Sequence, residues 1–198
     1  MIIPIVAYGT KVLKQKAEDI SSDYPNLDKL IKDMFETMYE ANGVGLAAPQ
    51  IGRSIRLFIV DGSPFADEDA DMEGFRKVFI NPQIVEESGD KWNFSEGCLS
   101  IPSIREDISR LSKVRIRYQD QDFNTIEEEY DGTKARIIQH EYDHVEGVLF
   151  TDYLSAIKKR LLKRKLNDIS KGNIKVGYRM KFPLKKGLKE AINWYINH

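Results

Sequence analysis

The chain has 198 residues, of which 41% are hydrophobic and 31% are charged. This composition is typical of a globular protein and excludes a disordered, collagen-like or membrane-embedded chain. The 30 basic and 31 acidic residues give a net charge of -1, so overall charge gives no reason to expect DNA as a partner. The length predicts one compact domain that can fold without disulfides or a structural metal.

The compartment is indicated by three absences in the sequence. Cys98 is the only cysteine, which excludes an internal disulfide and is typical of a reducing compartment. The apolar residues at the amino end are interrupted by Pro4 and have no basic stretch before them, unlike a signal peptide. No apolar run approaches the ~20 residues that span a bilayer. We therefore expect a cytoplasmic protein with no membrane partner.

The first strong pattern predicts an amphipathic helix that starts after Asn26. Hydrophobic side chains recur there with helical spacing, at Leu27, Leu30, Ile31, Met34, Phe35 and Met38. Asn42 and Gly43 predict its end, because both residue types favour the left-handed backbone found after helices. Such a helix has one apolar side with which to pack on the rest of the fold.

Several strands are predicted after this helix. Apolar or alternating segments occur at residues 55–60, 77–81 and 114–118. Residues 120–124 have the composition of a turn, which predicts an antiparallel hairpin between the third segment and residues 125–130. The acidic segment 64–74 is typical of a solvated loop, and we assign it no function.

A second helix is predicted after Asp131 and Gly132, with its end near Gly147. One of its sides carries Ala135, Ile138, Tyr142 and Val145. The other carries Ile137, His140, Glu141 and His144, at the spacing that brings side chains to one helix face. Residues 140–144 form an H-E-x-x-H motif, in which both imidazoles bind one metal and the glutamate stands beside the remaining coordination position.

A catalytic metal site needs a third protein ligand as well as a position for water. A metzincin-type peptidase would have a histidine where this chain has Phe150. A zincin-type peptidase could use Asp168, which lies in a lysine-rich segment without a supporting motif. Cys98 offers a thiolate, although an isolated cysteine is more often a small buried apolar residue. A closed structural site needs four protein ligands, and His198 is the only further imidazole.

Three motifs, taken together, resemble those of the peptide deformylase family. They are G-V-G-L-A-A-P-Q at residues 43–50, E-G-C-L-S at residues 96–100 and Q-H-E-Y-D-H at residues 139–144. The likeness extends in order and spacing from the amino end to about Leu154. It implies a single α+β domain in which antiparallel strands surround the H-E-x-x-H helix and the first helix packs outside. It also implies a hydrolase that acts on N-formylmethionyl nascent polypeptides and releases formate.

The resemblance also implies a role for each matched residue. The ligands of one divalent metal ion would be Cys98, His140 and His144. Glu141 would be the general acid and base, while Gln50 and the backbone N–H of Leu99 would face the developing oxyanion. Imidazole and thiolate suit zinc, nickel and cobalt as well as iron. The family resemblance implies Fe(2+) in cells.

A further set of residues would contact the substrate. Val44, Gly45 and Gly97 would pair with its backbone as an added strand would. Ile137, together with Val44, would contact the methionine side chain. Arg105 would line the substrate groove.

Charge is divided unevenly along the chain. Residues 151–198 contain 13 Lys or Arg and 3 Asp or Glu, which predicts a basic appendage from about residue 155 on the single domain of residues 1–198. An apolar side that could pack on the domain is formed by Ile157, Leu161, Leu162 and Leu166. The basic residues are interpreted either as a solvated helix face or as a surface for transient contact with ribosomal RNA.

Overall fold

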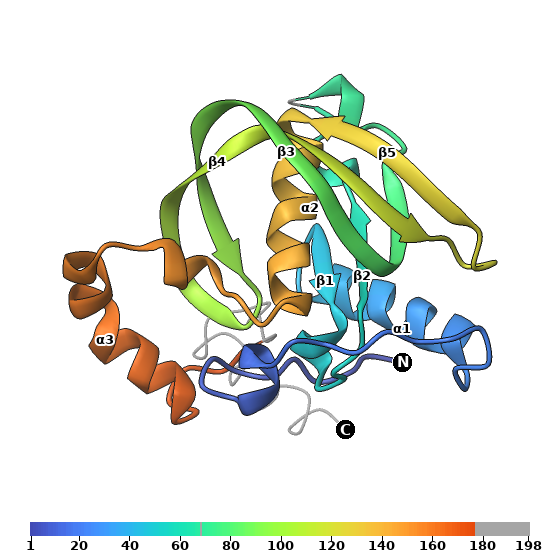
Figure 1. Cartoon of the computed structure of the whole chain (residues 1–198). Coiled ribbons are helices and arrows are strands. Elements are labelled where there is room, and N and C mark those ends of the chain that lie inside the picture. The colour runs from blue at the N-terminus through green and yellow to red at the C-terminus, as the bar shows by residue number, and fades with distance from the viewer. Residues whose placement is uncertain (68, 177–198) are drawn as a thin grey trace, which may run out of the picture.

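A computed structural model describes residues 1–67 and 69–176. In this part of the chain, five strands form one antiparallel sheet in the order β1-β2-β3-β4-β5 (Figure 1). The strands are β1 Gly45–Ala47, β2 Leu57–Asp61, β3 Arg76–Cys98, β4 Ile101–Gln119 and β5 Thr125–Asp131. The helices are α1 Leu27–Glu40, α2 Gly132–Val145 and α3 Ala156–Ser170. This arrangement confirms the α+β fold class.

The long hairpin of β3 and β4 gives the sheet its curved shape. Its register runs from Ile80 opposite Gln119 to Cys98 opposite Ile101, and is interrupted by several irregularities. Such bulges bend and twist a strand pair, and the hairpin curls around α2 in Figure 1. Both strands extend far beyond the predicted segments 77–81 and 114–118. The end of β3 thereby places Cys98 beside α2.

The predicted hairpin that follows is confirmed by the pairing of β4 with β5. Its turn is closed by Asp120, whose carboxylate accepts hydrogen bonds from the backbone N–H groups of Asp122 and Asn124, each at 2.9 Å. Such a side-chain bond to the backbone two residues on is the reason that aspartate favours turns.

Helix α2 lies inside the curved sheet and packs against β1, β2 and β4. Ala135, Ile138 and Val145 on its apolar side are completely buried. They join a core in which the Phe58 and Phe79 rings stack at 4.5 Å between centroids. Burial of this side fixes the rotation of α2 and thereby the direction in which His140 and His144 point.

Helix α1 packs outside, against β1 and β2, as predicted. Its buried hydrophobic residues are Leu27, Ile31, Met34, Phe35 and Met38. The residue in the left-handed conformation after the helix is Asn42, at φ +55°, whereas Gly43 does not adopt a positive φ. The sequence-based end of α1 was therefore right, although only Asn42 supplies the left-handed residue.

Helix α3 packs on the domain through its second half. Leu166 and Ile169 are buried in a cluster that includes Leu13 and Ile101. The expectation that Ile157 and Leu161 pack on the domain is wrong, because their exposed fractions are 74% and 77%. The prediction of one domain with a basic appendage extends to residues 177–198, which lie outside the described residues. No helix in the described part of the chain is both long and apolar enough to cross a membrane.

Candidate metal centre and active site

The three predicted metal ligands converge at one point. Helical spacing brings the rings of His140 and His144 to 5.2 Å between centroids, and the end of β3 places Cys98 Sγ 3.3 Å from His144 Nε2. One ligand atom from each of the three residues lies within 4.8 Å of the others. Two ligands of one tetrahedral zinc ion are separated by about 3.5 Å. The donor set and its spacing therefore fit a single divalent cation.

Glu96 holds the first histidine in place. Its Oε2 atom accepts a hydrogen bond from His140 Nδ1 at 2.9 Å, which leaves His140 Nε2 with its lone pair for a cation. Such a contact fixes the tautomer and orientation of a metal-ligating imidazole. The sequence predicts no role for Glu96, and the only signal for one is its place in the E-G-C-L-S motif.

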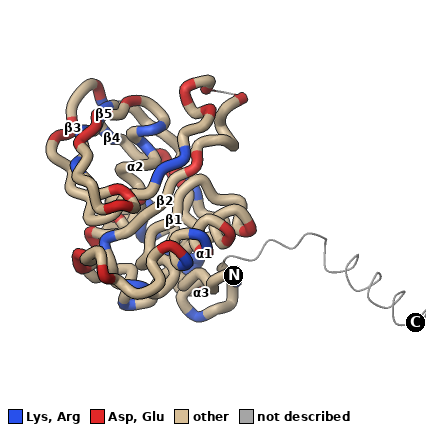
Figure 2. Tube along the Cα trace, turned by 90° about the vertical axis from the view of Figure 1, so that its right-hand side faces the viewer, with Lys and Arg blue, Asp and Glu red and all other residues tan. Residues whose placement is uncertain are grey.

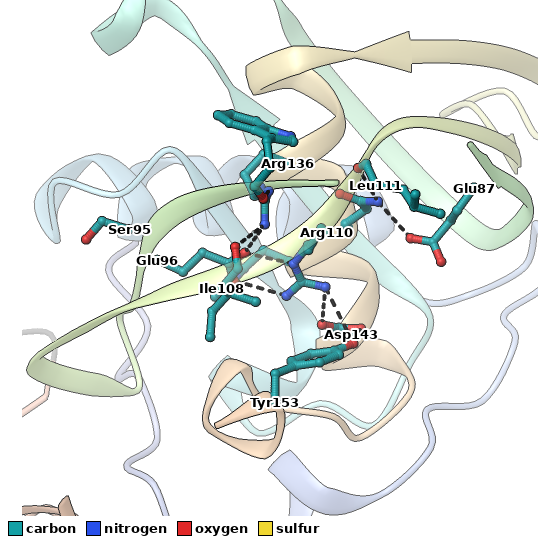
Figure 3. A network of polar contacts seen from close by, with 12 residues as sticks. Glu87, Ser95, Glu96, Ile108, Arg110, Leu111, Arg136, Asp143 and Tyr153 are labelled. Atoms are coloured by element: carbon teal, nitrogen blue, oxygen red, sulfur yellow. Dashed lines mark hydrogen bonds and ion pairs between the residues drawn. The ribbon is translucent and has the colours of Figure 1, made fainter. Parts of the chain in front are cut away.

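Glu96 belongs to a buried network of charged side chains (Figure 3). Arg110 donates to both of its carboxylate oxygens, at 2.7 and 3.0 Å, and forms an ion pair with Asp143 at 2.7 Å. Burial acts to raise the pKa of Glu96, but hydrogen bonds from His140 and Arg110 outweigh it and hold the pKa well below its usual range. Glu96 is therefore a carboxylate throughout the neutral pH range.

Glu141 is the carboxyl group beside the ligand cluster. It is 4% exposed, and among the described residues its Oε2 atom has no hydrogen-bond partner. Burial raises its pKa to about 7. A carboxyl group with this pKa can both accept and release a proton near neutral pH.

Gly45 leaves the space that Glu141 occupies. A Cβ atom at position 45 would lie 2.3 Å from Glu141 Oε1, which is far inside van der Waals contact. The predicted substrate-binding glycine is thus also the residue that permits the position of Glu141. This packing relationship is not visible in the sequence.

Gln50 points its amide at the same centre. Its Oε1 atom accepts a hydrogen bond from the backbone N–H of Ala47 at 2.8 Å, which directs Nε2 toward Cys98 Sγ at 3.4 Å. The side chain is fully buried, so this orientation is fixed. Leu99 directly follows Cys98 in the turn between β3 and β4.

A groove of about 610 Å³ leads to this centre. All five predicted substrate-binding residues line it, namely Val44, Gly45, Gly97, Arg105 and Ile137. The same is true of Gln50, Cys98, Leu99, His140 and Glu141. His144 lies behind them, with 1% of its surface exposed.

Several residues for which the sequence predicts no role also line the groove, among them Phe65, Phe94, Arg136 and Lys175. Phe65 belongs to the acidic segment 64–74, whose composition predicts only a solvated loop. None of the four lies in a chemically distinctive motif, because distant segments are brought to the groove only by the fold.

Comparisons with known proteins identify the family. A family model described as "Polypeptide deformylase" matches residues 2–160. The chain belongs to the peptide deformylase family. A peptide deformylase of Christiangramia forsetii is 57% identical over 190 residues, covering 92% of this chain and 97% of the relative. One from Cytophaga hutchinsonii is 58% identical over 186 residues, covering 94% and 100%.

Solved structures of peptide deformylases share the fold. A crystal structure from Legionella pneumophila matches with a TM-score of 0.76 and 36% identity, covering 87% of this chain and 98% of that chain. One from Thermus thermophilus also has a TM-score of 0.76 and 36% identity, covering 87% and 100%. The family match confirms the predicted enzyme, a metal-dependent hydrolase that removes the N-formyl group from newly made polypeptides. The alternatives of an H-E-x-x-H peptidase and of a purely structural metal site are therefore wrong.

Proposed function

We propose that Cys98, His140 and His144 hold the catalytic metal ion and that Glu141 moves the proton in deformylation. The observation that carries this assignment is the convergence of the three ligand atoms within 4.8 Å of one another, beside Glu141 and at the groove. A bound divalent cation acts as a Lewis acid and lowers the pKa of a coordinated water toward ~7.

Glu141 transfers the proton between water and the leaving amine. Its carboxylate accepts a proton as water attacks the formyl carbon, and the same carboxyl then donates a proton to the departing nitrogen. The C–N bond breaks, and the products are formate and the free α-amine of methionine. Burial raises the pKa of Glu141 to about 7, which suits both directions of transfer.

Gln50 and the backbone N–H of Leu99 stabilise the negative charge on the former carbonyl oxygen. The Gln50 amide is held by its bond to the Ala47 backbone N–H, so it does not reorganise during the reaction. A donor of this kind is typically worth ~3 kcal/mol in the transition state.

The substrate backbone lies as an added strand along the open edge of the sheet. Strand β1 pairs only with β2 among the described strands, so Val44 and Gly45 can offer backbone groups to a peptide. Gly97 pairs with the peptide from the end of β3. Val44 and Ile137 contact the methionine side chain, and Arg105 lines the groove beyond it.

The metal in cells is Fe(2+) in this proposal, and Zn(2+), Ni(2+) and Co(2+) are substitutes that the same donors accept. Purification without oxygen followed by metal analysis tests this identity. Iron at about one ion per chain supports it, whereas zinc alone in the anaerobic protein contradicts it.

Formate release from a formyl-methionyl peptide tests the proposed residue roles. The acetyl-methionyl peptide is the matched control substrate, because it adds one methyl group at the reacting carbon. We expect release of formate but little acetate, and loss of formate release when Glu141 is replaced. Equal hydrolysis of both peptides would contradict the tight formyl site.

We also propose that the enzyme acts in the cytoplasm, where its formylated substrates are made, and that α3 contacts the ribosome. Helix α3 carries six basic residues in one segment, Lys158, Lys159, Arg160, Lys163, Arg164 and Lys165. Lys158 pairs with Glu106, and Lys159 and Lys165 donate to backbone carbonyls. The three remaining residues make no ion pair with the described residues, and Ile157 and Leu161 are exposed beside them. Charge on this helix is therefore available for phosphate groups.

Co-sedimentation with ribosomes at low salt tests this contact. Replacement of Arg160, Lys163 and Arg164 by Gln should abolish co-sedimentation and leave formate release from a short peptide unchanged. A matched control replaces Lys91, Lys113 and Arg117 on β3 and β4. Absent co-sedimentation of the native protein, or equal loss in both variants, supports the solvated-face alternative.

A further inference from the structure

Arg136 connects the substrate groove with the ligand side of the site. The residue lines the groove but is only 1% exposed. Its Nη1 atom donates to Glu96 Oε1 and to the Ile108 carbonyl, each at 3.0 Å, and Nη2 donates to the Trp92 carbonyl at 2.7 Å (Figure 3). The guanidinium thereby ties the Glu96 carboxylate to the backbone of both β3 and β4.

Two aromatic rings cover the same guanidinium. Its central carbon lies 4.6 Å from the centroid of the Trp92 ring and 5.8 Å from that of Phe94. Cations are attracted to aromatic faces at these distances. Together with the hydrogen bonds to two carbonyls, the rings leave the Arg136 guanidinium with one orientation.

The Glu96 carboxylate has four donors, two on each oxygen. Oε1 accepts from Arg110 and Arg136, and Oε2 accepts from Arg110 and His140. Without Arg136, Oε1 would keep Arg110 as its single donor, and the carboxylate would lose its tie to the Ile108 and Trp92 carbonyls. The carboxylate and the Arg110 fork could then shift together, and the acceptor of His140 Nδ1 would move with them.

Arg136 also balances the buried charge. Glu96 and Asp143 carry two negative charges, and Arg110, which forms an ion pair with each of them, carries only one positive charge. Arg136 pairs with Glu96 and makes this set neutral. Charges are tolerated in a protein interior only where they are paired and hydrogen-bonded.

We propose that Arg136 is a positioning residue for His140, acting through Glu96. It holds the carboxylate in the rotation at which Oε2 accepts the His140 Nδ1–H, so that Nε2 of the same ring points at the cation. This role rests on the proposed assignment of His140 as a metal ligand.

The substitution Arg136→Lys separates geometry from charge. Lysine keeps the positive charge at position 136, so the Coulomb repulsion between this residue and a bound cation is the same kind in the variant as in the wild type. Its single ammonium cannot reproduce the fork that joins Glu96 to the Ile108 and Trp92 carbonyls. The matched control is Arg56→Lys, because Arg56 is also buried, donates to the Pro82 carbonyl and makes no contact with Glu96.

Two rates are measured in the folded proteins. The first is hydrogen exchange of the His140 Nδ1–H, followed by NMR of protein labelled with ¹⁵N-histidine, with and without metal. The second is the release of metal to a chelator. We expect Arg136→Lys to raise both rates at least about tenfold, as is typical for the partners of metal ligands, and Arg56→Lys to leave both within about twofold.

Unchanged rates in Arg136→Lys, or equal changes in both variants, would overturn the proposal. If Arg136→Lys does not fold, Trp92→Leu removes the covering ring and keeps Arg136 itself. Faster His140 Nδ1–H exchange in that variant supports the proposal, and wild-type exchange overturns it. Adding metal to the wild-type protein separately tests His140 as a ligand, because metal binding must shift the NMR signals of its imidazole. Hydrogen exchange of Nδ1–H in the metal-free protein reports on the contact with Glu96 alone.

Discussion

Glu96 Oε2 lies 2.9 Å from His140 Nδ1, so the residue two positions before Cys98 orients a histidine on α2. One short segment of β3 therefore supplies both a proposed ligand and the acceptor that holds a second ligand. Over the whole described chain, Lys and Arg alternate in place with Asp and Glu, and neither sign is confined to one part of it (Figure 2). Inside, the carboxylate of Glu96 is matched by the guanidinium groups of Arg110 and Arg136.

Glu96→Gln should weaken metal binding and destabilise the fold. The amide loses the charge that pairs with both arginines, and removing one partner of a buried pair typically costs about 3–5 kcal/mol. Metal release to a chelator should be about 10- to 100-fold faster. The control is Glu106→Gln, because Glu106 lies directly opposite Glu96 in the β3–β4 register. Equal behaviour of the two variants would contradict the role of Glu96.

Glu141→Gln should keep the metal but lose most activity. The amide cannot take up the proton of water, and a general acid–base group contributes ~100- to 10,000-fold to the rate. Metal content and formate release are measured on the same preparation. Turnover close to that of the wild type in a metal-loaded variant would rule out the proposed role.

Glu141 should also make the metal-free protein less stable as the pH rises. The pKa of Glu141 is about 7 in the folded protein, whereas a glutamate in an unfolded chain has a pKa of about 4.5. Between pH 4.5 and pH 7 the folded state therefore binds more protons than the unfolded state. Stability must then fall as the pH rises through this window, by about 3 kcal/mol in total. Denaturant unfolding at pH 5 and pH 8 measures the change. In Glu141→Gln most of this stability difference should be absent. An equal difference in the wild type and in Glu141→Gln would contradict the raised pKa of Glu141.

Gly45→Ala should reduce activity while leaving the metal bound. The new Cβ atom would stand 2.3 Å from Glu141 Oε1, so the carboxylate must move away from the reacting water. Gly62→Ala is the control, because its Cβ atom would meet the flexible end of Met72 instead. We expect kcat to fall at least about tenfold in Gly45→Ala only, since small displacements of catalytic groups are costly. An unchanged kcat would show that Glu141 has room to relax.

The local parts of the site could be predicted from the sequence, and the reason is periodicity. His140, Glu141 and His144 lie within about one helical turn of one another, so the H-E-x-x-H spacing alone sets their arrangement. Cys98 and Gln50 were predicted through motifs shared with a family, because nothing local to either residue brings it to the helix.

Other features depend on contacts between distant segments. Arg136 and Glu96 are 40 positions apart, and neither pattern nor composition indicates that they meet. The sequence does not predict the full length of β3 and β4 because consecutive polar residues, as at 86–91 and 105–107, break the alternation expected of strands. The exposure of Ile157 and Leu161 could not be predicted either, because a helical stripe does not show which half of the helix meets the core.

The metal content of Cys98→Ser tests the central claim most directly. An alcohol is a far poorer anionic donor than a thiolate at neutral pH, so the variant should retain much less metal per chain and release formate correspondingly slowly. The free energy of unfolding of the metal-free wild type and of metal-free Cys98→Ser controls for loss of packing, because neither protein holds the metal in that measurement. A Cys98→Ser protein that keeps the wild-type metal content and differs only modestly in stability would contradict the Cys98, His140 and His144 site.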